Sequence, residues 1–228
     1  MDKISTGISG LDHILKGGLI SGRNYLITGP PGSGKSTLGL HFLRQGLKDD
    51  ENVLFVSLCE IEEDLKDNAA LYNWDVSGIE LLCIDLIDVM ETPEYKNFRY
   101  FENLFSVLFA KKNYHRIVFD SLKKITLMEP KIEARRRILR LMSTLSSQKD
   151  CTVLFLDDVN KRFNSIQMYT LSGIIRFYFT RTPGGRERAV GIGKMRGDFT
   201  DERIHPYKIT KDGIEVFSDK VLFEKLNI

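Results

Sequence analysis

The sequence predicts an α/β protein with a mostly parallel, twisted β-sheet flanked by helices and an antiparallel β extension at the carboxyl end. Short apolar runs alternate with amphipathic stretches between Asn24 and Leu156, a pattern typical of parallel strands joined by crossover helices. A glycine-rich segment separates the first apolar run from the helix that follows it. The alternation stops at Leu171, where strand patterns joined by short turns begin.

Five apolar runs give the expected strands of the parallel part. Each run is short, and continuous apolar runs suit strands that helices cover on both faces of a sheet. The runs are Asn24–Thr28 (NYLIT), Asn52–Leu58 (NVLFVSL), Ile79–Asp85 (IELLCID), His115–Phe119 (HRIVF) and Cys151–Leu156 (CTVLFL).

The amphipathic stretches between these runs are the expected helices. In the stretch from Asn97 to Lys111, for example, Phe101, Phe105 and Leu108 fall on one helical face. The expected helices cover residues 34–47, 62–72, 97–111 and 132–147.

After Leu171 the sequence favours antiparallel pairing. The segment LSGIIRFYFTR is followed by a turn at Pro183–Gly185 and then by RERAVGIGKM, and a second turn at Lys211–Gly213 separates HPYKIT from GIEVF. Turns of this composition join neighbouring strands into hairpins. Because no linker, repeat or low-complexity tract interrupts the chain, residues 1–228 are expected to form a single domain.

Composition and charge narrow the class of protein. The 228 residues include 33 Lys+Arg and 31 Asp+Glu, and a net charge of +2 gives no overall field that favours nucleic acid or a membrane surface. Three cysteines without a CxxC pair fit a reducing compartment. The start MDKISTG lacks a secretory signal, and no apolar run reaches the ~18 residues of a membrane span. We therefore expect a cytoplasmic protein without membrane contact.

The segment Gly29-Pro30-Pro31-Gly32-Ser33-Gly34-Lys35-Ser36 carries the strongest chemical signal. It matches the P-loop pattern GxxxxGK[ST] and lies between an apolar strand and a helix, as that motif requires. The glycines permit a tight loop whose backbone N–H groups converge on phosphate oxygens, and the helix that includes Thr37 adds its positive dipole end. Lys35 is expected to reach the β- and γ-phosphates, and Ser36 is expected to ligate Mg²⁺.

Two acids after expected strands are candidates for the rest of a nucleotide site. Asp120 ends the run that begins at Arg116, and the carboxyl end of a parallel strand faces the ligand crevice, so Asp120 is expected to hold the metal. Glu60 follows the strand at 52–58 and should reach the same sheet edge. From its position alone, Glu60 is either the base that orients an attacking water or a surface acid.

Several short motifs together resemble a KaiC-type domain of the RecA ATPase superfamily. They are TGISGLDHILKGGLISGRNYLITGPPGSGKST at Thr6–Thr37, Asn68-Ala69 with Trp74-Asp75, IVFDS at Ile117–Ser121, and KMRG at Lys194–Gly197. The resemblance extends from residue 4 to about residue 218. It implies a RecA-like P-loop NTPase fold, binding and hydrolysis of ATP with Mg²⁺, and self-association into rings, commonly hexamers, with ATP between neighbouring subunits.

The resemblance also implies roles for individual residues. Glu60 aligns with the second member of a glutamate pair that supplies the catalytic carboxylate. Lys194 and Arg196 lie in the segment that carries a lysine and an arginine toward the γ-phosphate of the neighbouring subunit. The implied function is a homo-oligomeric regulatory ATPase, whose downstream protein partner the sequence does not identify.

Three features depart from the pattern of that family. Cys59 stands where the first glutamate of the pair is expected, which predicts slow turnover. Asp157-Asp158 end a strand at which the family often has small hydroxyl residues and a glutamate. A single P-loop in 228 residues argues against carrying over the circadian role and the autokinase activity of the two-domain clock protein.

Two other functions fit the same fold. A DNA-binding recombinase paralogue would need a basic DNA-facing loop, for which Lys161-Arg162 is the candidate, and the nearly neutral net charge gives it little support. A nucleotide-binding scaffold with little hydrolysis would follow from Cys59 in place of an acid. Salt-sensitive binding of single-stranded DNA would favour the first, and turnover that is unaffected by Glu60→Gln would favour the second.

Overall fold

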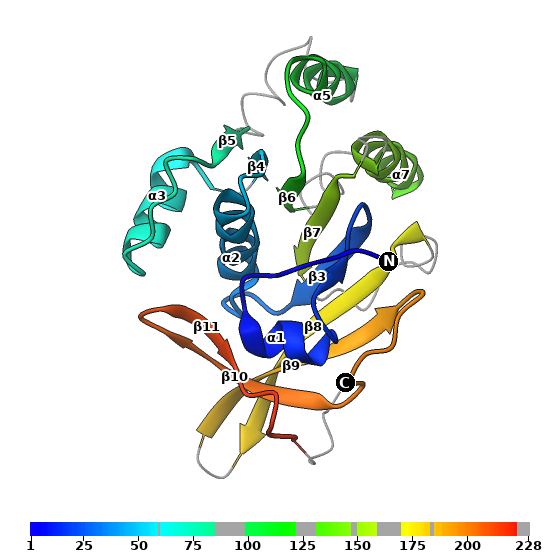
Figure 1. Ribbon diagram of the computed structural model, residues 1–228. Helices are drawn as coiled ribbons and strands as arrows, with labels where there is room; N and C mark the ends of the chain where they lie inside the picture. Colours follow the sequence, from blue (N-terminus) through cyan, green and yellow to red (C-terminus); the bar gives the residue numbers. More distant parts are fainter. Residues whose placement is uncertain are drawn as a thin grey trace.

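A nine-stranded mixed sheet forms the frame of the molecule (Figure 1). The computed structural model describes residues 1–58, 60–84, 99–121, 131–146, 150–158, 170–182 and 185–222. Its strands are β1 (Lys3–Ile4), β2 (Leu19–Ile20), β3 (Asn24–Gly29), β4 (Val53–Ser57), β5 (Glu80–Cys83), β6 (Arg116–Asp120), β7 (Thr152–Asp158), β8 (Gly173–Thr182), β9 (Gly185–Met195), β10 (Ile204–Thr210) and β11 (Gly213–Val216). The large sheet has the order β11-β10-β9-β8-β3-β7-β6-β4-β5, and β1 pairs only with β2.

The large sheet is parallel on one side and antiparallel on the other. Strands β8, β3, β7, β6, β4 and β5 pair in parallel. The change occurs at β8, which pairs in parallel with β3 and antiparallel with β9, and β9, β10 and β11 continue as an antiparallel ladder. The predicted α/β architecture with an antiparallel extension is therefore confirmed. The five predicted strands of the parallel part agree with β3 to β7 to within one or two residues.

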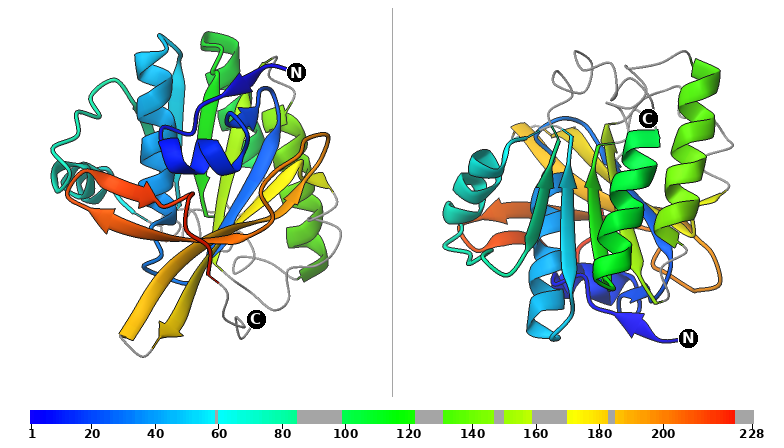
Figure 2. Two further views of the ribbon diagram at one scale, coloured as in Figure 1. Left: turned by 60° about the horizontal axis from the view of Figure 1, so that its bottom comes forward. Right: turned by 90° about the horizontal axis from the view of Figure 1, so that it is seen from above.

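Helices cover both faces of the parallel part (Figure 2). They are α1 (Ser9–Ile14), α2 (Lys35–Lys48), α3 (Glu62–Ala70), α5 (Arg99–Lys111) and α7 (Lys131–Ser146). Successive side chains of a strand point to opposite faces, so Val118 packs in one core cluster with α2, whereas Ile117 and Phe119 pack in another with Phe105 of α5 and Leu141 of α7. None of the helices described is both long and apolar enough to cross a bilayer.

The elements that the sequence did not predict lie near the amino end. They are the short α1 and the two-residue strands β1 and β2, which are too short to show a periodicity of hydrophobic residues. The helix predicted at residues 62–72 is two residues shorter in the structure, where α3 ends at Ala70 and a turn follows.

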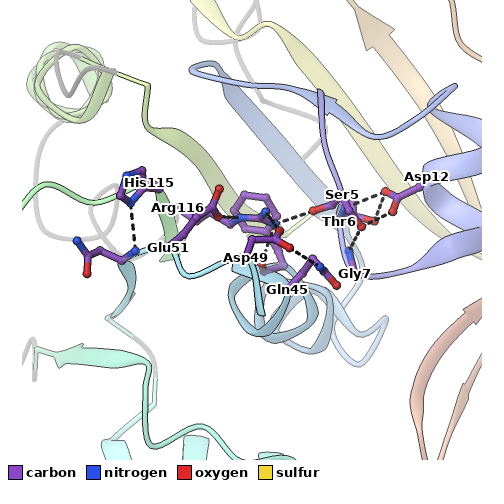
Figure 3. A network of polar contacts seen from close by, with 11 residues as sticks. Ser5, Thr6, Gly7, Asp12, Gln45, Asp49, Glu51, His115 and Arg116 are labelled. Carbon is purple, nitrogen blue, oxygen red and sulfur yellow. Dashed lines mark hydrogen bonds and ion pairs between the residues drawn. The ribbon is translucent and has the colours of Figure 1, made fainter. Parts of the chain in front are cut away.

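A buried arginine fastens the amino-terminal segment to the end of α2 (Figure 3). The Arg116 side chain is 1% exposed; it pairs with Asp49 at 2.7 Å and with Glu51. Its Nη1 also donates to the backbone carbonyl of Ser5 at 2.6 Å and to that of Phe42 at 3.1 Å. These contacts hold the amino end of β6, the carboxyl end of α2 and the amino-terminal segment together.

Candidate functional site

The P-loop connects β3 to α2 in the conformation that its glycines permit. Gly32 has φ 75° and Gly34 has φ 87°, backbone angles that side chains with a Cβ rarely adopt. At Gly29 a Cβ atom would lie 2.7 Å from the Cβ of Phe177, so only glycine fits between β3 and β8. The predicted loop from Gly29 to Ser36 is therefore built as a close turn at the carboxyl edge of the parallel strands.

The amino end of α2 offers backbone donors to an anion. Gly34 is the N-cap residue; no side chain caps the helix there, and its first turn has no acidic residue. The N–H groups of Lys35, Ser36 and Thr37 belong to the first turn, whose donors have no partner within the helix. Together with the positive end of the helix dipole, they form a phosphate-binding position.

Lys35 is held by three oxygen atoms. Its Nζ lies 3.0 Å from the carbonyl oxygen of Gly29 and 3.2 Å from that of Pro30. The third contact is an ion pair of 3.1 Å with the Asp158 carboxylate at the end of β7. The sequence identified Asp158 only as a departure from the family pattern and did not predict its contact with Lys35.

Ser36 and Asp120 meet where a metal-binding pair was predicted. The Ser36 hydroxyl donates to an Asp120 carboxylate oxygen at 2.7 Å. Burial raises the pKa of Asp120 and the nearby Asp158 adds to the rise, whereas the Ser36 hydrogen bond and the Lys35 charge oppose it. A hydroxyl and a carboxylate are oxygen donors of the kind that Mg²⁺ prefers.

The set of donors suits a metal that shares its ligands with a nucleotide. Within the part of the chain that the structure describes, no group of three or more His, Cys, Asp or Glu side chains could hold a metal by itself. Mg²⁺ commonly takes one or two protein ligands and completes its shell with phosphate oxygens and water. The pair of Ser36 and Asp120 beside the P-loop fits this arrangement.

Glu60 lies near Asp120 at the same sheet edge. Ser57 at the end of β4 is in register with Asp120, and Glu60 follows three residues later. The turn is fixed by Ser57, whose hydroxyl donates to the Glu60 carbonyl at 2.7 Å and accepts from its N–H at 2.9 Å. Burial raises the pKa of the Glu60 carboxyl, the charge of Asp120 raises it further, and a 3.4 Å hydrogen bond from Asn68 opposes the rise. Glu60 is therefore partly desolvated and close enough to Asp120 for the charge of Asp120 to raise its pKa.

Lys194 and Arg196 lie toward the amino ends of the parallel strands, whereas the P-loop of their own chain lies at the carboxyl ends. Lys194 is paired with Ile174, which is paired with Leu26 in the amino half of β3. The N–H of Arg196 bonds to Ser172, and the Ser172 N–H bonds to Asn24, the first residue of β3. At ~3.3 Å per residue, Arg196 is level with a point about 16 Å before Gly29 along β3, and Lys194 is level with Leu26, about 10 Å before Gly29. Within one subunit they do not join the site.

Two more residues contact the P-loop that the sequence analysis did not identify. The Tyr207 hydroxyl from β10 donates to the Ser33 carbonyl at 2.5 Å, and Arg188 from β9 approaches the Gly32 carbonyl at 3.5 Å. These contacts depend on the antiparallel extension folding back beside the loop, so they have no local signal in the sequence. Cys59, Lys161 and Arg162, on which other expectations rest, lie outside the described residues.

Comparison with known proteins decides the family. A family model described as "ATPase: KaiC" matches residues 4–221. The chain belongs to the KaiC family of ATPase domains. A UPF0273 protein of Pyrococcus horikoshii is 31% identical over 238 residues, with 96% of both chains covered. A UPF0273 protein of Thermotoga maritima is 29% identical over 233 residues, with 94% of this chain and 96% of that protein covered.

The circadian clock oscillator protein KaiC of a Picosynechococcus species is a longer relative. It is 28% identical over 232 residues, which are 95% of this chain and 45% of that protein. The crystal structure of a KaiC-like protein of Pyrococcus horikoshii superposes with a TM-score of 0.78 at 24% identity and covers 95% of this chain and 99% of that one. These matches confirm the predicted RecA-like α/β fold of a KaiC-family domain, and membership of this ATPase family implies nucleotide binding.

Proposed function

We propose that this KaiC-family domain is a Mg²⁺-dependent ATPase that works as a homo-oligomeric regulatory switch, with nucleotide bound at subunit interfaces. The observation that carries the proposal is the 2.7 Å contact between Ser36 and Asp120 beside a complete P-loop. A hydroxyl and a carboxylate from distant parts of the chain meet where the phosphates of a nucleotide would lie. This arrangement supports phosphoryl chemistry rather than a glycine-rich turn of purely structural use.

Each residue of the site has a chemical role in this proposal. The P-loop amides and the first turn of α2 bind the β- and γ-phosphates, and Lys35 neutralises part of their charge. Ser36 and Asp120 hold Mg²⁺, which when bound offsets charge on the phosphate oxygens. Glu60 orients a water for attack on the γ-phosphorus and accepts its proton, while the bond from the γ-phosphorus to the β–γ bridging oxygen breaks and ADP leaves. This role suits a partly desolvated carboxylate with a raised pKa.

The remaining positive charge comes from a second subunit in this proposal. Lys194 and Arg196 are level with the amino half of β3, whereas the P-loop follows its carboxyl end, and this separation supports a role in the site of another copy. A head-to-tail arrangement of this kind closes into a ring when the rotation between subunits permits it. Positive groups delivered across an interface stabilise the transition state and couple hydrolysis to assembly.

Turnover of Mg²⁺-ATP tests the proposed function directly. Purified wild-type protein is compared with Glu60→Gln, and Glu63→Gln is the matched control because Glu63 is an exposed acid in the first turn of α3. We expect ATP binding by all three proteins, hydrolysis by the wild type and the control, and a loss of hydrolysis in Glu60→Gln. Binding with no turnover in any of them would favour the scaffold function, and DNA-stimulated turnover would favour the recombinase function.

A further inference from the structure

Asp158 occupies a position from which a carboxylate meets the P-loop lysine. It is the last residue of β7 and is paired in register with Gly29, the first residue of the P-loop. Its Oδ1 lies 3.1 Å from the Lys35 Nζ. A lysine ammonium group has three hydrogen-bond donors, and Asp158 and the carbonyls of Gly29 and Pro30 supply three acceptors. Lys35 therefore has three oxygen partners within its own chain.

A phosphate that contacts Lys35 must share this cation with Asp158. Lys35 is 10% exposed and Asp158 is 28% exposed, so water screens the pair only in part. Asp120 ends β6, which lies beside β7, and Glu60 follows the end of β4 on the far side of β6. Asp158 contributes to the raised pKa of Asp120. Additional negative charge at this edge of the sheet is consequently unfavourable unless a cation offsets it.

We infer that Asp158 is a specificity-determining residue that lowers the affinity of the site for nucleoside triphosphate relative to nucleoside diphosphate. In the diphosphate complex Lys35 contacts the β-phosphate and keeps its partner Asp158. In the triphosphate complex the γ-phosphate takes Lys35 and is placed beside the Asp158 carboxylate, where two negative groups repel each other. The inference rests on the proposed nucleotide binding and adds a residue that reads the number of phosphates.

The test compares nucleotide affinities by calorimetry in the presence of Mg²⁺. The probes are ADP and AMP-PNP, a triphosphate whose β–γ bridge resists hydrolysis. Asp158→Asn retains the shape of the side chain and removes its charge. We expect this variant to bind AMP-PNP about fivefold more tightly than the wild type does and to bind ADP with little change, because removing a partly exposed like charge has an effect of this size.

Three variants make the result specific. Asp158→Glu keeps the charge and should retain the wild-type ratio of the two affinities. Asp158→Ser is a second neutral variant in case Asp158→Asn does not fold. Asp50→Asn removes an exposed carboxylate at the far end of α2, where φ is 57° and asparagine is well tolerated, and it should change neither affinity.

The outcomes separate this inference from the proposed function. If the wild type binds both nucleotides and the neutral variants leave the ratio of affinities unchanged or weaken AMP-PNP binding, the role of Asp158 is wrong and nucleotide binding stands. An equal increase in the affinities for ADP and AMP-PNP would show a general effect of charge and would also overturn the inference. If the wild type binds neither nucleotide, the proposed function fails and the inference fails with it.

Discussion

The hydroxyl of Ser36 donates to the carboxylate of Asp120 across 2.7 Å, although 84 residues separate the two in sequence. Ser36 belongs to the first turn of α2, and Asp120 ends β6. The contact forms because α2 packs over β6, and Gly39 permits the close approach, since a Cβ there would lie 2.9 Å from the Val118 Cγ1 of that strand. The hydrogen bond holds side by side the two oxygen donors that would hold Mg²⁺.

Asp120→Asn is expected to weaken nucleotide binding in Mg²⁺ by about tenfold or more, since loss of a residue that orients a metal's shell commonly has an effect of this size. Burial raises the pKa of Asp120, so the folded protein disfavours its charge, and the neutral variant should unfold at a temperature at least as high as the wild type. Calorimetry with and without EDTA checks the affinity. An equal loss of affinity in EDTA would contradict the metal role, and a double variant with Ser36→Ala should show non-additive losses.

Glu60 predicts an acidic limb in the rate of ATP hydrolysis. Burial and the charge of Asp120 raise its pKa above the ordinary value of 4.5. A general base acts only when it is deprotonated, so the rate should fall as the pH is lowered through this raised pKa. A profile of turnover against pH checks this, and the residual rate of Glu60→Gln should lack the same limb. A wild-type rate that stays constant down to the unperturbed value would contradict the assignment.

The parallel part of the fold could be predicted because its strands are continuous apolar runs, and three of these runs are followed by residues typical of a nucleotide site. The P-loop, Asp120 and Glu60 each follow such a run, and strand ends in a parallel sheet share one edge. The order of the strands in the sheet cannot be predicted from the local sequence of each strand. The Lys35–Asp158 pair exists because β7 lies beside β3, although three strands and more than a hundred residues separate β3 from β7 along the chain.

The contacts from the antiparallel extension are harder to predict for the same reason. Tyr207 reaches Ser33 only because β10 pairs with β9, β9 with β8 and β8 with β3, so the position of Tyr207 depends on three successive pairings. The opposite position of Lys194 and Arg196 could have been inferred had the parallel pairing of β8 with β3 been known. Pairing between distant strands depends on total packing rather than on any one residue.

Arg196→Ala is expected to act on the sites of neighbouring subunits. Because Arg196 lies at the sheet edge opposite to its own P-loop, the variant should retain an intact phosphate site and lack the group that it contributes to a neighbour. Mixing it with wild-type protein should lower the turnover per wild-type subunit in proportion to the variant fraction. Lys48→Ala, which changes an exposed base at the end of α2, is the control. Unchanged turnover in the mixtures would exclude the contribution in trans.

His41 predicts a pH dependence of stability. It is 8% exposed, and its Nε2 accepts the N–H of Ile214 at 2.9 Å. Burial, with help from the charge of Arg44, lowers the pKa of His41 from 6.5 to about 4. At a pH between these two values, His41 binds a proton more readily in the unfolded chain than in the folded one. The contribution of neutral His41 to the free energy of unfolding is therefore complete above pH 6.5 and is lost as the pH falls toward 4.

The corresponding change in the free energy of unfolding is about 3 kcal/mol at most. Denaturant unfolding of wild type and His41→Gln at several pH values isolates it, since glutamine does not titrate and the difference between the two curves removes the other groups. His13→Gln, at an exposed site on α1, should follow the wild-type curve. Parallel curves for wild type and His41→Gln would show that the buried imidazole does not govern this range.

Arg116 should contribute far more to the free energy of unfolding than Lys112, a more exposed cation shortly before β6. It is 1% exposed and pairs with Asp49 and Glu51, so Arg116→Met would leave two acids and two backbone carbonyls without this partner. We expect the free energy of unfolding to fall by about 3 kcal/mol, because the loss of the buried guanidinium leaves two backbone carbonyls and the 21% exposed Glu51 carboxylate without their donor. Lys112→Met breaks a 3.3 Å pair with Glu80 in which both side chains are 40% exposed, and it should change the same quantity by less than about 1 kcal/mol.

Urea denaturation of the two variants and the wild type measures these changes. Similar losses in both variants would mean that the network around Arg116 is no stronger than a surface pair. Since Arg116 begins β6 and Asp120 ends it, nucleotide affinity measured where Arg116→Met is folded should remain that of the wild type.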